Sequence, residues 1–212
     1  IVQEKRENTG GSVIMVGQDG GRTVMVHRGA SSQLDPHDIP MRALKKADWV
    51  HLSSIAGRKF TLYAIAAALR EGHTSCSWNP GHQELQMLAS GKIAPDLIPC
   101  QILFVNSAEW KILQPVQQAL KRYIPEVIVT RGDKGGKAYI QGKRNVLQFK
   151  SSVHKCIDST GAGDAFGVGY TTARIYGEDP EEACRWGVKN AGSVIRYFGA
   201  KPGLLTHHQL SN

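Results

Sequence analysis

Two aspartates, Asp158 and Asp164, stand on either side of a turn of small residues in the stretch DSTGAGDAF, and a helix-like apolar run follows. A loop that enters a helix at Gly161 leaves the first backbone amides of that helix without carbonyl partners, at the positive end of the helix dipole. Such amides form an anion site, and glycine lets a ligand approach the backbone closely. Asp164 falls within the first helical turn, where its carboxylate can accept a proton. An anion hole beside a base suits phosphoryl transfer to a hydroxyl group, which depends on positioning and charge stabilisation.

The same stretch has two other interpretations. Gly-x-Gly turns are common before helices, so these residues could form no more than a capped helix. The spacing of Gly161 and Gly163 is also that of the first two glycines of a dinucleotide-binding fingerprint. However, Phe166 stands where the third glycine would be, and no acidic residue ends a strand about 20 residues later. We therefore disfavour a nicotinamide-dependent dehydrogenase.

A second glycine-rich segment, TRGDKGG from Thr130 to Gly136, follows an apolar run that predicts a strand. Its backbone amides could cradle phosphate oxygens, although a plain turn before a hairpin has the same composition. It is not a Walker A loop, because the pattern GxxxxGK[ST] occurs nowhere in the chain.

Asn106 and Glu109 form a polar pair at the end of another predicted strand. Polar side chains at the carboxyl ends of parallel strands lie where open α/β sheets bind ligands. Glu109 could hold Mg²⁺ through water, since this ion keeps most of its waters and needs few carboxylates. Alternatively, Asn106 caps a helix that has Glu109 in its first turn.

The spacing of apolar residues predicts strands that alternate with helices, which indicates an α/β fold with a mainly parallel sheet and helices on both faces. The predicted strands are 49–53, 74–78, 102–106 and 127–130, and the predicted helices are 41–46, 59–71, 83–89, 161–176 and 180–197, with one or two further helices over 109–120 that are interrupted at Pro115. Two hairpins are expected, one joining 12–17 to 22–27 over an Asp-Gly turn and one joining 137–140 to 145–149. We expect Gly72 and Gly199 to close helices, and His207 and His208 to lie in a solvated tail.

Composition and charge restrict the function classes. A net charge of +8 attracts anionic small molecules as readily as nucleic acid, and the basic residues are scattered without interleaved aromatics, so we expect no nucleic-acid role. No stretch approaches the ~18 apolar residues of a membrane span, so we expect no membrane role. The four cysteines lack CxxC spacing, which predicts reduced thiols in a cytoplasmic protein and neither a disulfide framework nor a zinc site.

Taken together, the motifs occur in the order known from one family. DSTGAGDAF resembles the C-terminal signature of the ribokinase (pfkB-type) carbohydrate kinases, TRGDKGG resembles their T-x-G-x-x-G segment beside the nucleotide phosphates, and Asn106 with Glu109 resembles their N-x-x-E motif. The resemblance covers the whole chain but only the C-terminal two thirds of the usual family length. It implies a ribokinase-like three-layer α/β/α domain over residues 1–212 that lacks its N-terminal third, with a lid-proximal hairpin at 10–30.

The resemblance also implies a function and roles for individual residues. The chain would be an ATP-dependent kinase that phosphorylates a hydroxyl of a sugar-like substrate, with Asp164 as the general base at the substrate and Gly161, Ala162 and Gly163 as the anion hole. ATP and Mg²⁺ are the implied cofactors, with K⁺ as an additional cation; Glu109 would serve Mg²⁺ and Asp158 a monovalent cation. The implied nucleotide contacts are Asn106, Thr130, Gly132, Gly135, Thr160, Gly163 and Asn190, and the implied substrate contacts are Ser53 and Asn79.

Three points stay open on the sequence. The acceptor could be a nucleoside instead of a sugar. The chain could also be a catalytically incompetent nucleotide-binding fragment, since the sugar-binding N-terminal part is absent from it. Its partners would be small molecules, with homodimerisation through the lid as an alternative in the full-length parent.

Overall fold

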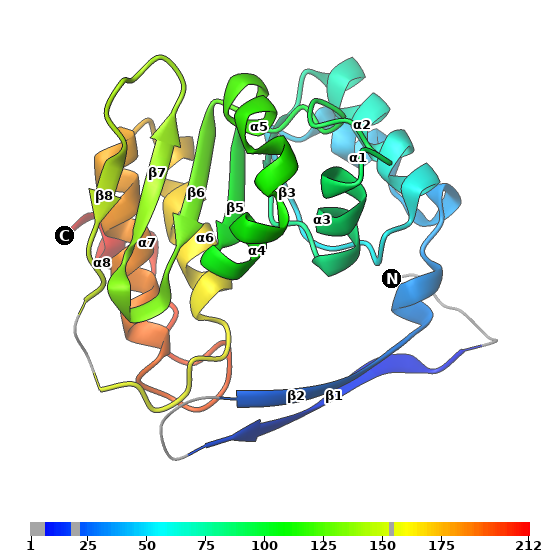
Figure 1. Ribbon diagram of the computed structural model, residues 1–212. Coiled ribbons are helices and arrows are strands. Elements are labelled where there is room, and N and C mark those ends of the chain that lie inside the picture. The colour runs from blue at the N-terminus through cyan, green and yellow to red at the C-terminus, as the bar shows by residue number, and fades with distance from the viewer. Residues whose placement is uncertain (1–6, 18–21, 153–154) are drawn as a thin grey trace. The chain divides into compact units, whose positions relative to one another are not determined.

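The computed structural model describes residues 7–17, 22–152 and 155–212. The described residues form two compact units, one from the described parts of Ile1–Ser12 and Val26–Val127 and the other from those of Val13–Met25 and Ile128–Asn212. A sheet of six strands runs in the order β3-β4-β5-β6-β7-β8, and a separate two-stranded sheet is formed by β1 and β2 (Figure 1). The predicted α/β fold is confirmed.

The first unit contains the parallel strands. β3 (Trp49–Leu52) pairs in parallel with β4 (Ser75–Trp78), and β4 pairs in parallel with β5 (Ile102–Asn106). The apolar residues of β4 and β5 are buried, as expected for strands with helices on both faces, whereas Trp49 and Val50 of β3 are only partly buried. The helical segments of this unit are η1 (Ala30–Gln33), η2 (Pro36–Asp38), α1 (Met41–Lys46), α2 (Lys59–Gly72), α3 (His82–Ala89), α4 (Ser107–Ile112), η3 (Gln114–Val116) and α5 (Gln117–Tyr123).

The second unit contains the antiparallel end of the sheet and the longest helices. β6 (Glu126–Thr130) leads into it, and β7 (Gly136–Ile140) pairs antiparallel with β8 (Leu147–Phe149). α6 (Ala162–Ile175) and α7 (Pro180–Val194) pack side by side behind these strands in Figure 1, with α8 (His207–Ser211) beside them. Phe149 of β8 stacks on Phe166 of α6 at 5.2 Å between ring centroids, which joins the strand layer to the helix layer.

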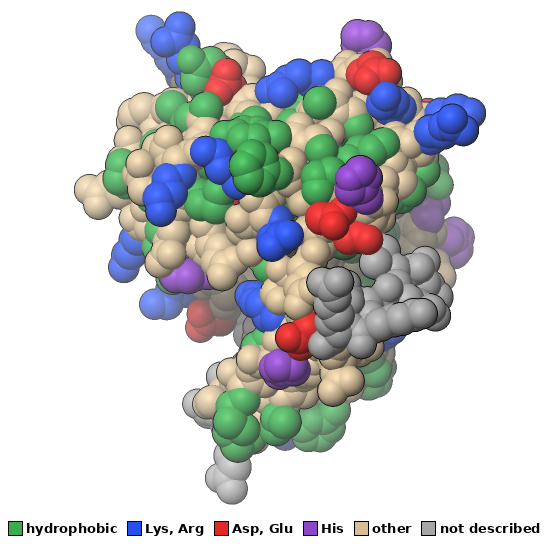
Figure 2. All heavy atoms as spheres, turned by 90° about the vertical axis from the view of Figure 1, so that its right-hand side faces the viewer, with side chains coloured by type: hydrophobic (Ala, Val, Ile, Leu, Met, Phe, Trp, Pro, Cys, Tyr) green, Lys and Arg blue, Asp and Glu red, His purple; other side chains and the backbone are tan. Residues whose placement is uncertain are grey.

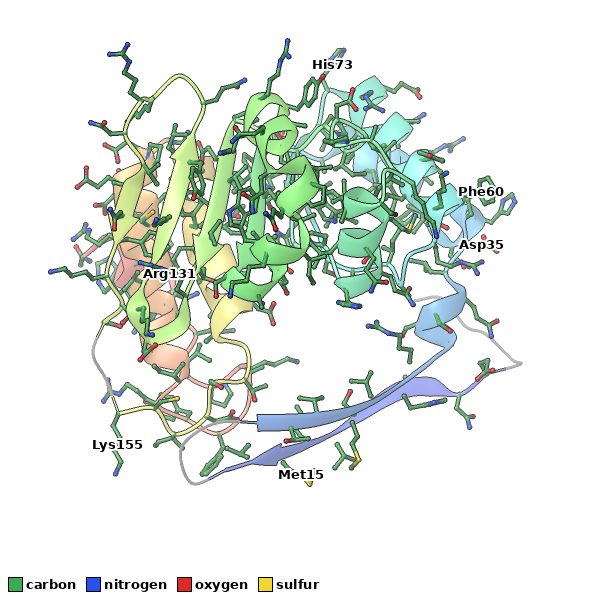
Figure 3. The ribbon with its side chains drawn as sticks, in the orientation of Figure 1. Met15, Asp35, Phe60, His73, Arg131 and Lys155 are labelled. Carbon is green, nitrogen blue, oxygen red and sulfur yellow. The ribbon has the colours of Figure 1, made fainter. Side chains whose placement is uncertain are left out.

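β1 (Thr9–Val16) and β2 (Arg22–Gly29) form the predicted hairpin, whose Asp-Gly turn at 18–21 lies outside the described residues. Apolar side chains of both strands are exposed, among them Met15, which points away from the ribbon in Figure 3. The large exposed apolar residues of the hairpin are Val13, Ile14, Met15, Val24, Met25 and Val26.

Three details of the predicted elements were wrong. α2 includes Gly72, and His73 takes the left-handed conformation after it (φ 51°, ψ 31°; labelled in Figure 3). α7 ends at Val194, so Gly199, with φ +90°, lies in the turn beyond it and does not cap it. His207 and His208 are exposed, as predicted, but they belong to a helix and not to a tail: α8 buries Leu210, and His207 stacks on Tyr176 at 4.0 Å between centroids.

No helix among the described residues is both long and apolar enough to cross a membrane. On the face shown in Figure 2, Lys and Arg side chains are scattered among apolar and neutral ones and do not form one continuous patch.

Candidate active site

The turn before α6 lies where the sequence predicts a loop to enter a helix, one residue earlier than the observed helix start. Gly161 is the residue immediately before the helix and has left-handed dihedrals (φ 79°, ψ 0°), which a residue with a side chain rarely adopts. Ala162, Gly163 and Asp164 form the first turn, and the Asp164 side chain is exposed. Among the described residues, no side chain caps this end of the helix. The N–H of Ala162 donates to the carbonyl of Ser159 at 3.3 Å, and the remaining amides of the first turn can face an anion.

Asp158 fixes the loop that leads into this turn. Its side chain is 3% exposed, and Oδ1 accepts hydrogen bonds from the backbone N–H of Thr160 (2.9 Å) and from the Thr160 hydroxyl (2.6 Å). Oδ2 accepts a hydrogen bond from the N–H of Gly199 at 2.9 Å. The carboxylate therefore ties the loop to the turn that follows α7. Thr160, expected at the nucleotide, directs its hydroxyl to Asp158.

The TRGDKGG segment forms a compact loop between β6 and β7. η4 (Gly132–Lys134) occupies its centre, and the N–H of Arg131 donates to the carbonyl of Gly135 at 2.7 Å. Arg131 is labelled at this loop in Figure 3. The Ser151 hydroxyl, beyond β8, donates to the carbonyl of Asp133, which anchors the loop to the second hairpin strand.

The second unit has a pocket of about 400 Å³ between this loop and the turn before α6. Thr130, Gly132, Gly135 and Gly163, which were predicted as nucleotide contacts, all line it, and so does Ala162 of the predicted anion hole. The other lining residues are Asp133, Phe149, Ser151, Ser152, Cys156, Ser159, Phe166, Val188, Ala191, Gly192 and Ile195. The polar loop residues and helix amides thus face the same space as a set of apolar side chains.

The apolar part of the pocket was not predicted from the sequence. Val188, Ala191, Gly192 and Ile195 line it from α7 and its end, and their i, i+3, i+4, i+7 spacing is the signal that could have shown one face of a helix. Asn190 lies on another face. It is 1% exposed, donates to the carbonyl of Ala165 at 2.7 Å and accepts from the N–H of Leu205 at 3.0 Å.

Asn190 is not among the residues that line the pocket, and its side chain links α6, α7 and the segment before α8. Its contact with a nucleotide stays a prediction. Asp133, a member of the TRGDKGG segment that was not itself predicted as a nucleotide contact, also lines the pocket.

Asn106 and Glu109 belong to the first unit and form a capping box at the start of α4. Asn106 Oδ1 accepts from the N–H groups of Ala108 and Glu109, each at 2.9 Å, and Glu109 Oε2 accepts from the N–H of Asn106 at 2.7 Å. Burial raises the pKa of the Glu109 carboxyl, while the hydrogen bond from Asn106 and the charge of His82 act in the opposite direction. The cap interpretation is thus confirmed, and the magnesium role of Glu109 stays a prediction.

Ser53 and Asn79 also lie in the first unit, each directly after a parallel strand. Because Leu52 pairs with Trp78 in register, both residues leave the sheet at the same edge. The N–H of Asn79 donates to the carbonyl of Leu52 at 2.8 Å, which holds the ends of the two strands together. The structure brings this predicted pair together; its contact with a substrate stays a prediction.

The described residues contain no group of three or more His, Cys, Asp or Glu side chains arranged to hold a metal ion. The oxygen donors of Glu109 and Asp158 nevertheless suit hard cations such as Mg²⁺ and K⁺ by their chemistry. The carboxylate oxygens of Asp158 would contact such an ion in addition to accepting the three hydrogen bonds described above.

Comparison with known proteins gives a consistent set of relatives. A sequence model described as pfkB family carbohydrate kinase matches residues 1–207. The chain is 28% identical over 203 residues to an uncharacterised sugar kinase of Archaeoglobus fulgidus, covering 92% of this chain and 80% of that one. It is 25% identical over 208 residues to a ribokinase of Arabidopsis thaliana, covering 93% of this chain but only 55% of the relative.

Solved structures share the fold. The structure of Arabidopsis thaliana ribokinase complexed with ribose and ATP matches with a TM-score of 0.74 at 23% identity, over 97% of this chain and 69% of that one. An adenosine kinase from Sinorhizobium meliloti matches with a TM-score of 0.76 at 22% identity, over 96% of this chain and 64% of that one. The chain thus spans about two thirds of the length of these structures.

Proposed function

The chain belongs to the pfkB family of carbohydrate kinases, and from that premise we propose that it transfers the γ-phosphoryl group of ATP to a hydroxyl of a sugar or sugar-like acceptor. The observation that carries the proposal is the pocket of the second unit. It is bounded by the glycine-rich loop after β6 and by the first turn of α6, and it joins a polar end to an apolar one. A nucleotide has the matching chemistry, with charged phosphates at one end and a flat base at the other.

In this proposal the phosphates lie against backbone amides. The N–H groups of Gly161, Ala162 and Gly163 stabilise the negative charge that develops on the transferred phosphoryl group. Thr130, Gly132 and Gly135 contact the phosphates from the other side of the pocket, and the base lies among the apolar residues of α7 and Phe166.

Asp164 is the proposed general base. Its carboxylate is exposed in the first helical turn, beside the amides that would hold the phosphoryl group. It takes the proton of the acceptor hydroxyl as that oxygen attacks the γ-phosphorus, and the bond from the γ-phosphorus to the bridging oxygen of ADP breaks. Ser53 and Asn79 are proposed to contact the acceptor.

Two cations complete the proposal. Mg²⁺ neutralises phosphate charge when it is bound, and Glu109 would serve it through water. Asp158 would hold K⁺ beneath the loop that leads to the anion hole. These assignments rest on the family resemblance and on the chemistry of the two carboxylates.

A nucleoside is the second candidate acceptor, favoured by one observation. A nucleoside kinase of Methanocaldococcus jannaschii is 28% identical to this chain over 141 residues, covering 64% of this chain and 45% of that one. We further propose that residues 1–212 form part of a single kinase domain with β1 and β2 as part of its lid. A full-length parent that dimerises through this lid would cover the exposed apolar hairpin side chains.

Titration of the folded protein with Mg-ATP and Mg-ADP in a calorimeter tests the nucleotide site. Binding at 100 times the dissociation constant should stabilise the fold by about 2.7 kcal/mol. Release of ADP in the presence of ribose or inosine then tests transfer and the acceptor class. Absence of heat and of a melting shift in a folded sample would overturn the nucleotide proposal, and nucleotide binding without transfer would indicate the catalytically incompetent fragment.

A further inference from the structure

The loop that follows β3, residues 54–57, is held by a buried carboxylate that has no place in the function proposed above. Glu84, in the first turn of α3, is 0% exposed. Its Oε1 accepts hydrogen bonds from the N–H groups of Ile55 (2.9 Å) and Gly57 (2.8 Å), and its Oε2 accepts from the Ser54 hydroxyl (3.1 Å).

The backbone of this loop has the form of an anion-binding nest. Ala56 and Gly57 are both left-handed, with φ of 56° and 68°, and this turns the N–H groups of Ile55 and Gly57 toward the same carboxylate oxygen. The N–H of Ala56 donates to Ser54 Oγ at 3.2 Å. A left-handed alanine is strained, by about 1–2 kcal/mol per residue, so the carboxylate holds the loop in a conformation that it would not keep alone.

The Glu84 side chain is held by hydrogen bonds from backbone and hydroxyl donors. Burial of an ionised carboxylate is costly unless hydrogen bonds or an opposite charge compensate for it. Among the described residues, no Lys or Arg forms an ion pair with Glu84. The compensation comes from backbone and hydroxyl donors, as in sites where a loop must be held rigidly in place.

The fixed loop lies between two features at the edge of the first unit. On one side is Ser53, exposed at the carboxyl end of β3, beside Asn79 at the end of β4. On the other side are Arg58 and Thr61, whose side chains donate to the carbonyl of Leu34 at 3.2 and 3.0 Å. Ser53 thus directly precedes in the chain the loop that Glu84 holds.

We propose that Glu84 is a positioning residue for the acceptor side of the reaction. By filling the nest of residues 55–57, its carboxylate fixes the end of β3 and hence the exposed Ser53 relative to Asn79. This inference rests on the proposed function, because it assumes that Ser53 and Asn79 contact the acceptor. It predicts that Glu84 governs acceptor affinity and leaves nucleotide affinity unchanged.

The test compares Glu84→Met with Glu84→Gln in the whole chain, using ribose and inosine as acceptors. Methionine has a similar shape but accepts no hydrogen bond from the two amides, so the acceptor KM should rise about tenfold or more, as expected when hydrogen bonds to a charged group are lost. Glutamine keeps one oxygen that can accept from both amides and should restore most of the acceptor affinity. The KM for ATP should change by less than about twofold in both variants, the range of a neutral surface substitution.

Glu126→Gln is the matched control, because Glu126 is the other buried glutamate among the described residues. It should lower the melting temperature without raising the acceptor KM. If Glu84→Met does not fold, the small effect left in Glu84→Gln decides: faster hydrogen exchange at Ile55 and Gly57, with an acceptor KM raised by clearly less than tenfold and an unchanged KM for ATP, supports the proposal. Equal changes in the acceptor and ATP constants, or a loss of stability with both constants unchanged, would overturn it.

Failure of the proposed function gives a different result. In that case the wild-type chain itself shows no transfer. The dissociation constants of ribose and inosine, measured by calorimetry, then take the place of the acceptor KM. Weaker acceptor binding in the Met variant than in the Gln variant still supports the inference. A wild type that binds neither acceptor, or variants that bind them as the wild type does, overturns it.

Discussion

Gly161 packs directly against Ala200: a β-carbon built on Gly161 would lie 2.6 Å from the Ala200 β-carbon and 2.8 Å from its α-carbon. Gly161 also has φ of +79°. Gly161→Ala should therefore be destabilising for two reasons, the left-handed backbone and a clash that pushes the anion-hole turn off Ala200. We expect a total loss of about 2–4 kcal/mol, and weaker Mg-ATP binding than the fold alone would explain. Thermal unfolding and calorimetry measure the two effects.

Gly142 provides the control for the destabilisation that comes from the left-handed backbone alone. It has the same φ of +79°, but nothing lies within 4 Å of the position of its β-carbon. Gly142→Ala should show the strain of the left-handed backbone without the clash and should leave nucleotide binding unchanged. Equal melting temperatures and equal nucleotide affinities for the two variants would contradict the packing of Gly161 against Ala200.

Gly72 shows where the sequence is ambiguous. A glycine at the end of an apolar-periodic run predicts a helix cap, yet Gly72 lies inside α2. A β-carbon there would come within 2.5 Å of the Lys45 α-carbon and carbonyl oxygen, so glycine is needed for the close packing of α1 on α2. Local pattern cannot separate the two explanations, because the second depends on a residue far away in the chain.

A substitution distinguishes them. Helix propensity alone predicts that Gly72→Ala stabilises the protein by about 1 kcal/mol, whereas overpacking predicts a loss of about 1–3 kcal/mol. We expect the loss, measured as a lower midpoint of denaturant unfolding with an unchanged slope. A gain in stability would show that α1 can move away from α2 at little cost.

In the candidate site, too, the features that depend on local sequence could be predicted, and those that depend on distant contacts could not. The small residues around Gly161 predicted the entry of a loop into a helix, although not the left-handed backbone of Gly161. Capping preference predicted Asn106 before Glu109, and composition predicted the glycine-rich loop after β6. The burial of Asn190 and the stacking of His207 on Tyr176 could not be predicted, because both depend on which helices pack together. The apolar half of the pocket, from Phe149 to Ile195, is likewise formed by tertiary contacts.

Cys156 gives a chemical probe of the pocket. It is the exposed cysteine among four, and it lines the pocket, whereas Cys76, Cys100 and Cys184 are buried. Burial raises the pKa of Cys76 to about 12 and that of Cys100 well above its usual range, so neither forms the reactive thiolate near neutral pH.

Iodoacetamide at pH 8 should therefore modify one thiol of the native protein, and Mg-ATP should slow that reaction. Mass spectrometry of tryptic peptides identifies the site, and Cys156→Ser should remove the labelling. Labelling that proceeds at the same rate with saturating Mg-ATP would show that the nucleotide does not occupy this pocket.

Glu109 predicts a pH dependence of stability. Because burial raises its pKa above the ordinary 4.5, the folded protein holds the Glu109 proton more tightly than the unfolded chain does. The stabilisation is fully present below the ordinary pKa and is lost as pH rises through the raised one. Glu109→Gln, which imitates the protonated form and can still complete the capping box, should thus gain stability relative to wild type between pH 4 and the pH at which Glu109 is fully ionised.

Denaturant unfolding of both proteins in the absence of Mg²⁺ measures this difference. A gap between variant and wild type that stays constant over the acid range would contradict the raised pKa. Addition of Mg²⁺ should favour the ionised wild type if Glu109 serves the ion, and it should have no such effect on the Gln variant.

Asp164→Asn separates the two interpretations with which the sequence began, a general base or a simple helix cap. Asparagine is nearly isosteric and leaves the amides of Gly161, Ala162 and Gly163 in place, but it cannot take a proton from the acceptor. Turnover should fall by about 10²–10⁴, the usual effect of removing a general base. Nucleotide affinity should be kept or slightly increased, since a negative charge near the γ-phosphate is lost.

The control must be an aspartate away from the pocket, which excludes Asp133 because it lines the pocket. Asp48, exposed just before β3, is suitable, and Asp48→Asn should change turnover and stability little. If Asp164 only caps the helix, Asp164→Asn should lower the melting temperature, and turnover should fall only in proportion to the fraction of protein that is unfolded. If Asp164→Asn retains more than about a tenth of the wild-type turnover, the loss is smaller than a general base requires, and the carboxylate then serves the helix and not the reaction.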